Sequence, residues 1–136
     1  SSRSLPDSFR VNPLNREYEI MSGTYTEAFG HLVGEVRNLK DAAGDTFDAY
    51  SALTTKAMAD GALDRKTKEL IAMVARITRL CEGCIISHAR GAAKAGATRE
   101  ELAEAAGVAI MMNGGPGATY AAKAVAAFDE FAAAKK

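Results

Sequence analysis

Residues 64–96 read DRKTKELIAMVARITRLCEGCIISHARGAAKAG and carry the strongest structural signals in the chain. Asp64 is a preferred helix N-cap residue, and apolar residues recur at helical spacing from there to Leu80. A second helix is expected from the cysteines to about Ala95, where Gly96 can adopt the left-handed conformation that ends helices. The stretch therefore predicts two consecutive helices joined by a short turn just before the cysteines.

The rest of the chain extends this pattern to an all-α fold of about six helices. An apolar stripe of Phe29, Leu32, Val33 and Val36 predicts a helix from Tyr25 to about Lys40. A second helix fits residues 46–60, with a stripe of Phe47, Tyr50, Leu53, Ala57 and Met58, and Gly61 is expected to end it. We expect methionines 58, 73, 111 and 112 to fill the core.

Two alanine-rich helices are expected at the end of the chain. Thr98-Arg-Glu-Glu101 is a capping box for the fifth, and Asn113-Gly114-Gly115-Pro116-Gly117 separates it from the sixth. This glycine-rich run follows no strand and lacks a GKS/T sequence, so we interpret it as a turn and not as a phosphate loop. Residues 1–21 contain two prolines and little periodicity. They predict an extended arm, followed by a single helical domain over residues 22–136.

Composition narrows the functional classes. The chain has 136 residues, 48% of them hydrophobic, with 17 basic and 17 acidic side chains that cancel. A balanced charge does not favour nucleic acid, and no apolar run approaches the roughly 20 residues that cross a bilayer. We therefore expect a cytosolic protein that binds neither nucleic acid nor membranes. Its two cysteines form one close pair, which in that compartment indicates redox chemistry or metal binding.

The cysteines occur as Cys81-Glu82-Gly83-Cys84, and His88 follows four residues later. On a helix these three side chains fall within an arc of about 60°. Thiolates are the reactive form of cysteine, and a helix N-terminus favours them. Because His88 lies at i+4 from Cys84 and can exchange a proton with it, we predict that Cys84 attacks and Cys81 resolves.

Glu69 lies twelve residues before Cys81 on the preceding helix. If the chain doubles back near Arg79, Glu69 and His88 lie about 15 and 10 Å from the turn, at ~1.5 Å per residue, and become neighbours. A carboxylate against an imidazole fixes its tautomer and raises its basicity. The predicted catalytic residues are therefore Cys84, Cys81, His88 and Glu69, with no cofactor and no metal ion.

Two alternatives stay open. Two thiolates, an imidazole and a carboxylate could form a tetrahedral zinc site. The chain could instead be a helical oligomerisation module whose thiols have no catalytic role. Arg76 and Arg79 could help to hold a thiolate, although exposure to solvent is their default, and His31 is interpreted as structural.

The pattern of Glu69, Cys81-x-x-Cys84 and His88 resembles the alkylhydroperoxidase D branch of the carboxymuconolactone decarboxylase family, over roughly Phe47 to Phe131. The resemblance implies an all-helical fold, homotrimers or homohexamers, and peroxidase activity of the Cys84/Cys81 pair. It also implies a Glu69/His88 proton relay and a lipoyl-bearing or thioredoxin-like reductant. The chain departs from the pattern at Gly83, where the best-known members carry a further histidine. Decarboxylases of the family generally lack the cysteine pair, which argues against lactone decarboxylation.

Overall fold

Five helices make up the part of the chain that the computed structural model describes, residues 24–134. They are α2 (Tyr25–Ala42), α3 (Gly44–Met58), α4 (Arg65–Thr78), α5 (Glu82–Lys94) and α6 (Arg99–Ala134). No strand occurs among these residues, so the predicted all-α class is confirmed. The expected N-terminal arm, residues 1–21, lies outside the described part.

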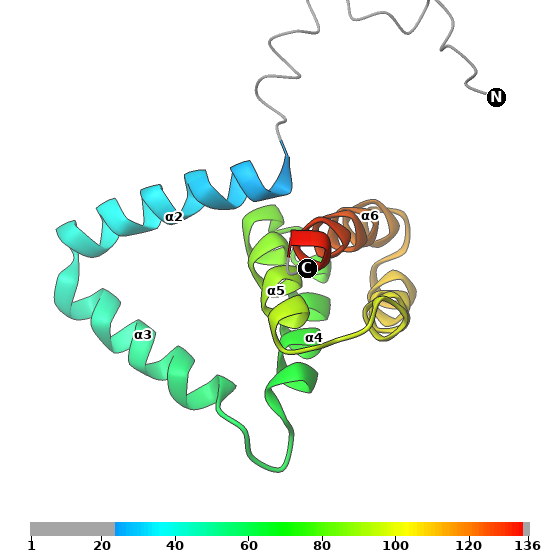
Figure 1. The fold of residues 1–136 in the computed structure, drawn as a ribbon, viewed down its shortest axis with the longest axis horizontal. Helices are drawn as coiled ribbons and strands as arrows, with labels where there is room; N and C mark the ends of the chain where they lie inside the picture. Colours follow the sequence, from blue (N-terminus) through cyan, green and yellow to red (C-terminus); the bar gives the residue numbers. More distant parts are fainter. Residues whose placement is uncertain (1–23, 135–136) are drawn as a thin grey trace, which may run out of the picture.

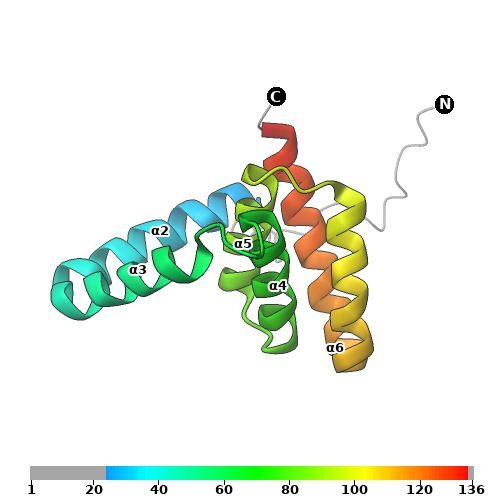
Figure 2. The same ribbon diagram turned by 90° about the horizontal axis from the view of Figure 1, so that it is seen from below.

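The predicted fifth and sixth helices form one bent element, α6. Gly114, with φ 62° and ψ −140°, is non-helical and reverses the chain, so that α6 is a hairpin of two antiparallel helical segments (Figure 2). The segments touch at the turn: a Cβ on Gly117 would lie 2.9 Å from the carbonyl oxygen of Ala109. Glycine is therefore needed at 114 for its positive φ and at 117 for close approach.

The predicted helix boundaries in the central stretch are largely confirmed. Asp64 caps α4 by accepting a 2.8 Å hydrogen bond from the Thr67 amide. Thr98 and Glu101 form the capping box, each side chain accepting from the other's backbone N–H. Gly96 adopts φ 86° after α5.

The predicted helix stop at Gly61 is wrong, because α3 already ends at Met58 and Ala59 is extended. The connection to α4 is held by polar contacts instead. The Arg65 amide donates to Asp60, and the Lys68 ammonium donates to the Ala59 carbonyl. These contacts between side chains and backbone take the place of a glycine cap.

The hydrophobic core lies among α4, α5 and α6 (Figure 1). Small side chains let these helices approach closely, as the alanine content of α6 predicted. The inward faces of both α6 segments are buried, whereas Met111 and Met112 are 75% and 69% exposed, so their predicted core role is wrong. The core residues are Met73, Ile77, Ile85, Ile86, Ala89, Ala92, Ala93, Leu102, Ala106, Ala109, Ala121, Ala124, Ala127 and Phe128.

Helices α2 and α3 form a V-shaped arm that projects from this core (Figure 1). The first half of α2 contacts the core. Its Tyr25 and Thr26 amides donate to the Glu130 carboxylate, and Phe29 packs edge-on against Phe131 with 5.9 Å between ring centroids. Neither helix contains a buried residue, although both carry the predicted apolar stripes. The predicted stripes therefore lie on the helices but are only partly covered within one copy: Phe29 and Leu32 are half-buried, whereas Val33 and Val36 are exposed.

Candidate active site

Glu69 is the buried charged residue of α4, only 4% exposed, on the same face as Met73 and Ile77. Spacings of four residues bring these three side chains to the core face of the helix. A carboxylate in such a position needs polar partners, since burial without them is costly. Glu69 has two: His88 Nδ1 lies 2.9 Å from Oε2, and the Arg65 guanidinium donates to Oε1 at 3.3 Å.

His88 comes from the middle of α5 and is brought to Glu69 by the antiparallel packing of α4 and α5. An ionised carboxylate can only accept hydrogen bonds. The Nδ1 atom therefore carries the proton in the contact with Glu69, and in the neutral ring Nε2 is left as the acceptor. The arrangement holds the imidazole in the tautomer that a general base requires.

Gly91, one turn after His88, makes room for this contact. A Cβ at Gly91 would lie 2.5 Å from Glu69 Cδ and 2.6 Å from each carboxylate oxygen. The Glu69 side chain therefore passes directly over the backbone of α5. Neither Gly91 nor Arg65 was predicted from the sequence to belong to the site. The spacing of Arg65 and Glu69 at i,i+4 was a usable signal for the second, whereas a lone glycine inside a helix gave none for the first.

The cysteines lie at the start of α5, as predicted. Cys81 is the N-cap residue and Cys84 lies in the first turn, and the two form a disulfide with 5.3 Å between their Cα atoms. The turn before them is tight: the Cys81 amide donates to the Arg76 carbonyl, and Leu80 adopts φ 55°. This closes α4 with a left-handed residue, in a position that usually holds glycine, and directs the chain into α5.

Two cavities meet at His88. One, of about 560 Å³, contains the disulfide and is lined by residues of α2, α3, α4 and α5, among them Val36, Tyr50 and Arg76. The other, of about 670 Å³, contains Glu69 and is bordered by charged side chains. Thr54, Ser87 and His88 line both. The imidazole thus contacts the buried carboxylate and lines the cavity that contains the disulfide.

Charged groups around the second cavity are paired. Lys66 lies 2.9 Å from Glu101, and the hydrogen bond raises the pKa of Lys66 and lowers that of Glu101. Asp64 accepts hydrogen bonds from the start of α4, which lowers its pKa. Both candidates for holding a thiolate, Arg76 and Arg79, are exposed, and of the two Arg76 lines the disulfide cavity.

The structure places Gly83 directly beneath α2. A Cβ there would lie 3.3 Å from Leu32 Cδ2, so a side chain of α2 covers the position. A histidine at 83 would have to displace Leu32.

The geometry does not support the zinc alternative. Among residues 24–134, no three His, Cys, Asp or Glu side chains are grouped to hold a metal ion.

The fold and the site together define an all-helical thiol protein in which a CxxC disulfide lies beside a Glu/His dyad. The model of the carboxymuconolactone decarboxylase family matches residues 44–127, and the chain belongs to this family. None of the described helices is long and apolar enough to span a membrane.

Similar proteins occur in several bacteria. Uncharacterized protein 4 in the cox locus of Paracoccus denitrificans is 48% identical over 84 residues, which cover 61% of this chain and 75% of that protein. A crystal structure of a family protein from Legionella pneumophila superposes with a TM-score of 0.77 at 40% identity, covering 79% of this chain and 96% of that one. A Thermotoga maritima family protein, suggested to take part in an antioxidative response, gives a TM-score of 0.66 at 27% identity and covers 79% and 92% of the two chains.

Proposed function

We propose that this protein is a thiol-dependent peroxidase that reduces hydroperoxides, or exchanges disulfides, through Cys84 and Cys81. The observation that carries the proposal is the 2.9 Å contact between His88 and the buried Glu69, made by a histidine that lines the same cavity as the disulfide. A disulfide alone could be structural. A buried carboxylate that fixes the tautomer of an imidazole beside that disulfide is the arrangement that proton transfer to and from a thiol requires.

The reaction balances as a two-electron exchange. The Cys84 thiolate attacks the terminal oxygen of ROOH, the O–O bond breaks, and the leaving alkoxide takes a proton from the His88 imidazolium to become ROH. Cys84 is then a sulfenic acid. The Cys81 thiolate attacks its sulfur, the S–O bond breaks, and hydroxide leaves as water after protonation. The two thiols are oxidised to the disulfide, and the hydroperoxide is reduced to an alcohol and water.

Positions on α5 favour Cys84 as the attacking residue. Cys84 and His88 lie at i,i+4, which places their Cβ atoms about 5–6 Å apart on one face of the helix. Cys81 is the N-cap residue, outside the first helical turn, and needs only to reach Cys84. Glu69 acts through His88 as a positioning residue, with Arg65 on its other oxygen.

The cavity around the disulfide suits an organic hydroperoxide, because Leu32, Val36 and Tyr50 form part of its wall. A dithiol donor would reverse the oxidation, and family resemblance suggests a lipoyl-bearing or thioredoxin-like protein. The antioxidative role suggested for the Thermotoga maritima relative supports the reduction of hydroperoxides as the reaction. We do not propose lactone decarboxylation, because the relay here serves a thiol pair.

A peroxide titration of the reduced protein tests the proposal. We expect two thiols to disappear together, with a loss of about two mass units as both thiol hydrogens are removed. Cys84→Ser should abolish peroxide consumption, whereas Cys81→Ser should leave a sulfenic acid on Cys84 that a dimedone-type reagent labels. Labelling of Cys81 in the Cys84→Ser variant would reverse the assignment, and thiols that survive excess peroxide would refute the activity.

A further inference from the structure

Cys84, Ser87 and Arg90 follow one another along α5 at a spacing of three residues. Each step turns the side chain by about 60° and advances it by about 4.5 Å, so the three side chains form one row along the helix. Cys84 lines the cavity that contains the disulfide, Ser87 lines both cavities, and Arg90 lines the second cavity, which contains Glu69. The row therefore leads from the disulfide into the second cavity.

Arg90 is an exception to the pairing of charges around the second cavity. Its guanidinium carbon lies 4.6 Å from the centroid of the Phe29 ring, which is a cation–π contact. Such a contact uses the positive charge and none of the five N–H donors of the group. Within residues 24–134, none of these donors has a hydrogen-bond acceptor. Arg90 is half-buried, so its charge is partly removed from water and has no anion in return.

The Ser87 hydroxyl is also without a partner. Hydroxyls elsewhere in the helices bond back to the carbonyl four residues earlier, as those of Thr54 and Thr55 do. Ser87 makes no such bond in the described part of the chain. No polar side-chain atom there is both sealed from solvent and unpaired, so the hydroxyl and the Arg90 donors open onto the cavity. Adjacent donors of which one is charged match the oxygens of a carboxylate.

The acidic side chains of the second cavity are already engaged elsewhere. Asp60 and Asp64 accept backbone amides at the start of α4, at 2.7 and 2.8 Å, and Glu69 is in contact with His88. None of them forms an ion pair with Arg90. The cavity volume of about 670 Å³ lies within the range of small-molecule sites. The cavity can therefore admit an anionic group that pairs with Arg90.

We propose that Arg90 and Ser87 bind the carboxylate of an acidic organic hydroperoxide whose peroxide group reaches Cys84. The two ends of the row are six residues apart, so the acid and the peroxide group lie about 9 Å from each other, at ~1.5 Å per residue. The carbon chain between them passes Ser87 and Thr54, which line both cavities. The carboxylate site stands on the unpaired donors and the cavity, whereas the substrate class rests on the function proposed above.

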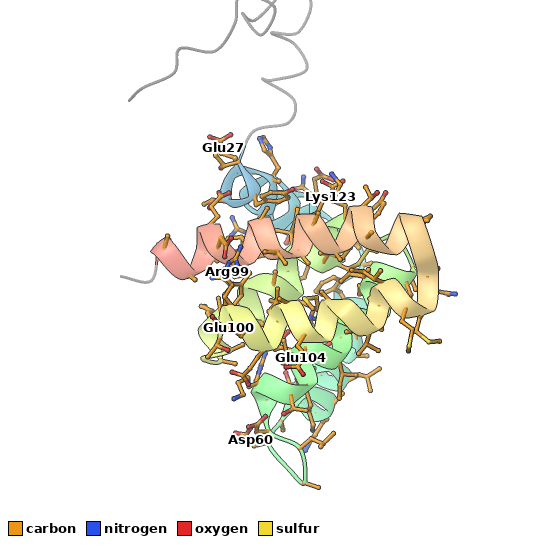
Figure 3. All side chains as sticks on the ribbon, turned by 90° about the vertical axis from the view of Figure 1, so that its right-hand side faces the viewer. Glu27, Asp60, Arg99, Glu100, Glu104 and Lys123 are labelled. Atoms are coloured by element: carbon orange, nitrogen blue, oxygen red, sulfur yellow. A yellow bond between two sulfur atoms is a disulfide. The ribbon has the colours of Figure 1, made fainter. Side chains whose placement is uncertain are left out.

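Binding to the oxidised protein tests the site without any peroxidase chemistry. Calorimetric titrations with octanoate, 1-octanol and inorganic phosphate should show octanoate binding once per chain, at least about tenfold more tightly than either of the others. Arg90→Gln should weaken octanoate binding by about tenfold or more, and Ser87→Ala by about threefold. Arg99→Gln is the matched control: Figure 3 looks onto the α6 side of the core, where Arg99 pairs with Asp129 and lines neither cavity.

Further variants separate recognition of the carboxylate from loss of structure. Arg90→Lys keeps the charge but not the planar pair of donors, so it should retain part of the affinity. Circular dichroism checks each fold, and Arg90→Met, which keeps an apolar stem against Phe29, replaces Arg90→Gln if that variant unfolds. Octanol or phosphate that binds as tightly as octanoate would overturn the site. So would equal octanoate affinities in Arg90→Gln and Arg99→Gln.

Kinetics with the reduced protein test the substrate class. The ratio of kcat/KM for a hydroperoxide of a carboxylic acid to that for its methyl ester should be about ten or more, and Arg90→Gln should bring this ratio close to one. Arg99→Gln should keep the wild-type ratio. Equal consumption of acid and ester by the wild type would overturn the substrate class and leave the proposed function standing. A protein that binds octanoate through Arg90 but consumes neither hydroperoxide would refute the proposed function, and the substrate class with it, while the carboxylate site would stand.

Discussion

Replacing Gly91 with alanine should disable the proposed proton relay without removing any of its chemical groups. The new Cβ would lie 2.5 Å from Glu69 Cδ, whereas non-bonded carbons favour about 3.5–4.0 Å. The carboxylate must therefore move by about 1 Å. His88 and Glu69 are 2.9 Å apart, and a displacement of that size takes them beyond the ~3.2 Å limit of an ordinary N–H···O bond.

Gly91→Ala has two opposite effects on the free energy of unfolding. Alanine inside a helix is favoured over glycine by about 1 kcal/mol. Loss of a hydrogen bond to a charged group costs about 1.5–3 kcal/mol. The free energy of unfolding should thus fall by about 0.5–2 kcal/mol. The thiol reaction with peroxide at neutral pH should slow by about 10²-fold, the lower end of the range for acid–base groups, because Glu69 acts only through His88.

The assay compares the pH dependence of thiol alkylation and of peroxide consumption with urea denaturation. Gly30→Ala is the matched control, since Gly30 lies within α2 and has nothing within 4 Å of a Cβ. The free energy of unfolding of Gly30→Ala should rise by up to about 1 kcal/mol, and its thiols should react with peroxide at the wild-type rate. In the Gly91→Ala background, Glu69→Asp shortens the side chain and should restore part of the rate. A Gly91→Ala protein with wild-type rates across the pH range would refute the idea that Gly91 positions the carboxylate.

Three further outcomes are expected. His88→Ala and Glu69→Gln should each slow thiolate reactivity at neutral pH, by roughly 10²- to 10⁴-fold for the histidine, and circular dichroism should show an unchanged fold. Burial raises the pKa of Glu130, but hydrogen bonds from the start of α2 outweigh burial and lower the pKa overall. The ionised Glu130 therefore stabilises the fold at pH values above its unfolded pKa of about 4.5. This contribution to stability is lost as the pH falls through the lower pKa of the folded state. Urea titrations should show Glu130→Gln less stable by about 1 kcal/mol at pH 7, with the difference shrinking in acid. Gly83→His should loosen the contact of α2 with α5 by displacing Leu32, and α2 should then become more sensitive to proteases. Adding Leu32→Ala to this variant should relieve the clash and lower the protease sensitivity again.

The Glu69–His88 contact could be predicted because it depends on local geometry. One tight turn separates α4 from α5, so the residues opposite each other follow from helical rise alone. The caps at Asp64, Gly96 and Thr98 were predictable for the same reason, since each is made by residues within a few positions of the helix end.

Features that depend on distant parts of the chain could not be predicted in this way. Periodicity identified the apolar stripes of α2 and α3, but it does not state what covers a stripe, and within one copy no residue of either helix is fully buried. The core role predicted for Met111 and Met112 was wrong likewise, because both lie just before the reversal of the chain at Gly114, where they are exposed, and the position of that turn against the core depends on distant contacts. The end of α3 was misplaced at Gly61 because Asp60 and Ala59 pair with α4, a contact that no local pattern records.

The residues proposed to react and the residues that form the walls of the disulfide cavity come from different parts of the chain. Cys84 and His88 lie on α5 and Glu69 on α4, and one short turn joins these two helices, so the thiol and the proposed relay are carried by a helix pair that the sequence predicts from local signals. The walls of the disulfide cavity come in large part from α2 and α3, through Leu32, Val36 and Tyr50. Changes in the arm can therefore alter which molecule reaches the disulfide without disturbing the proton relay. The arm and α5 touch where Leu32 lies over Gly83 and where Arg90 lies 4.6 Å from the ring centroid of Phe29, so a change at either contact would reach the disulfide cavity through α2.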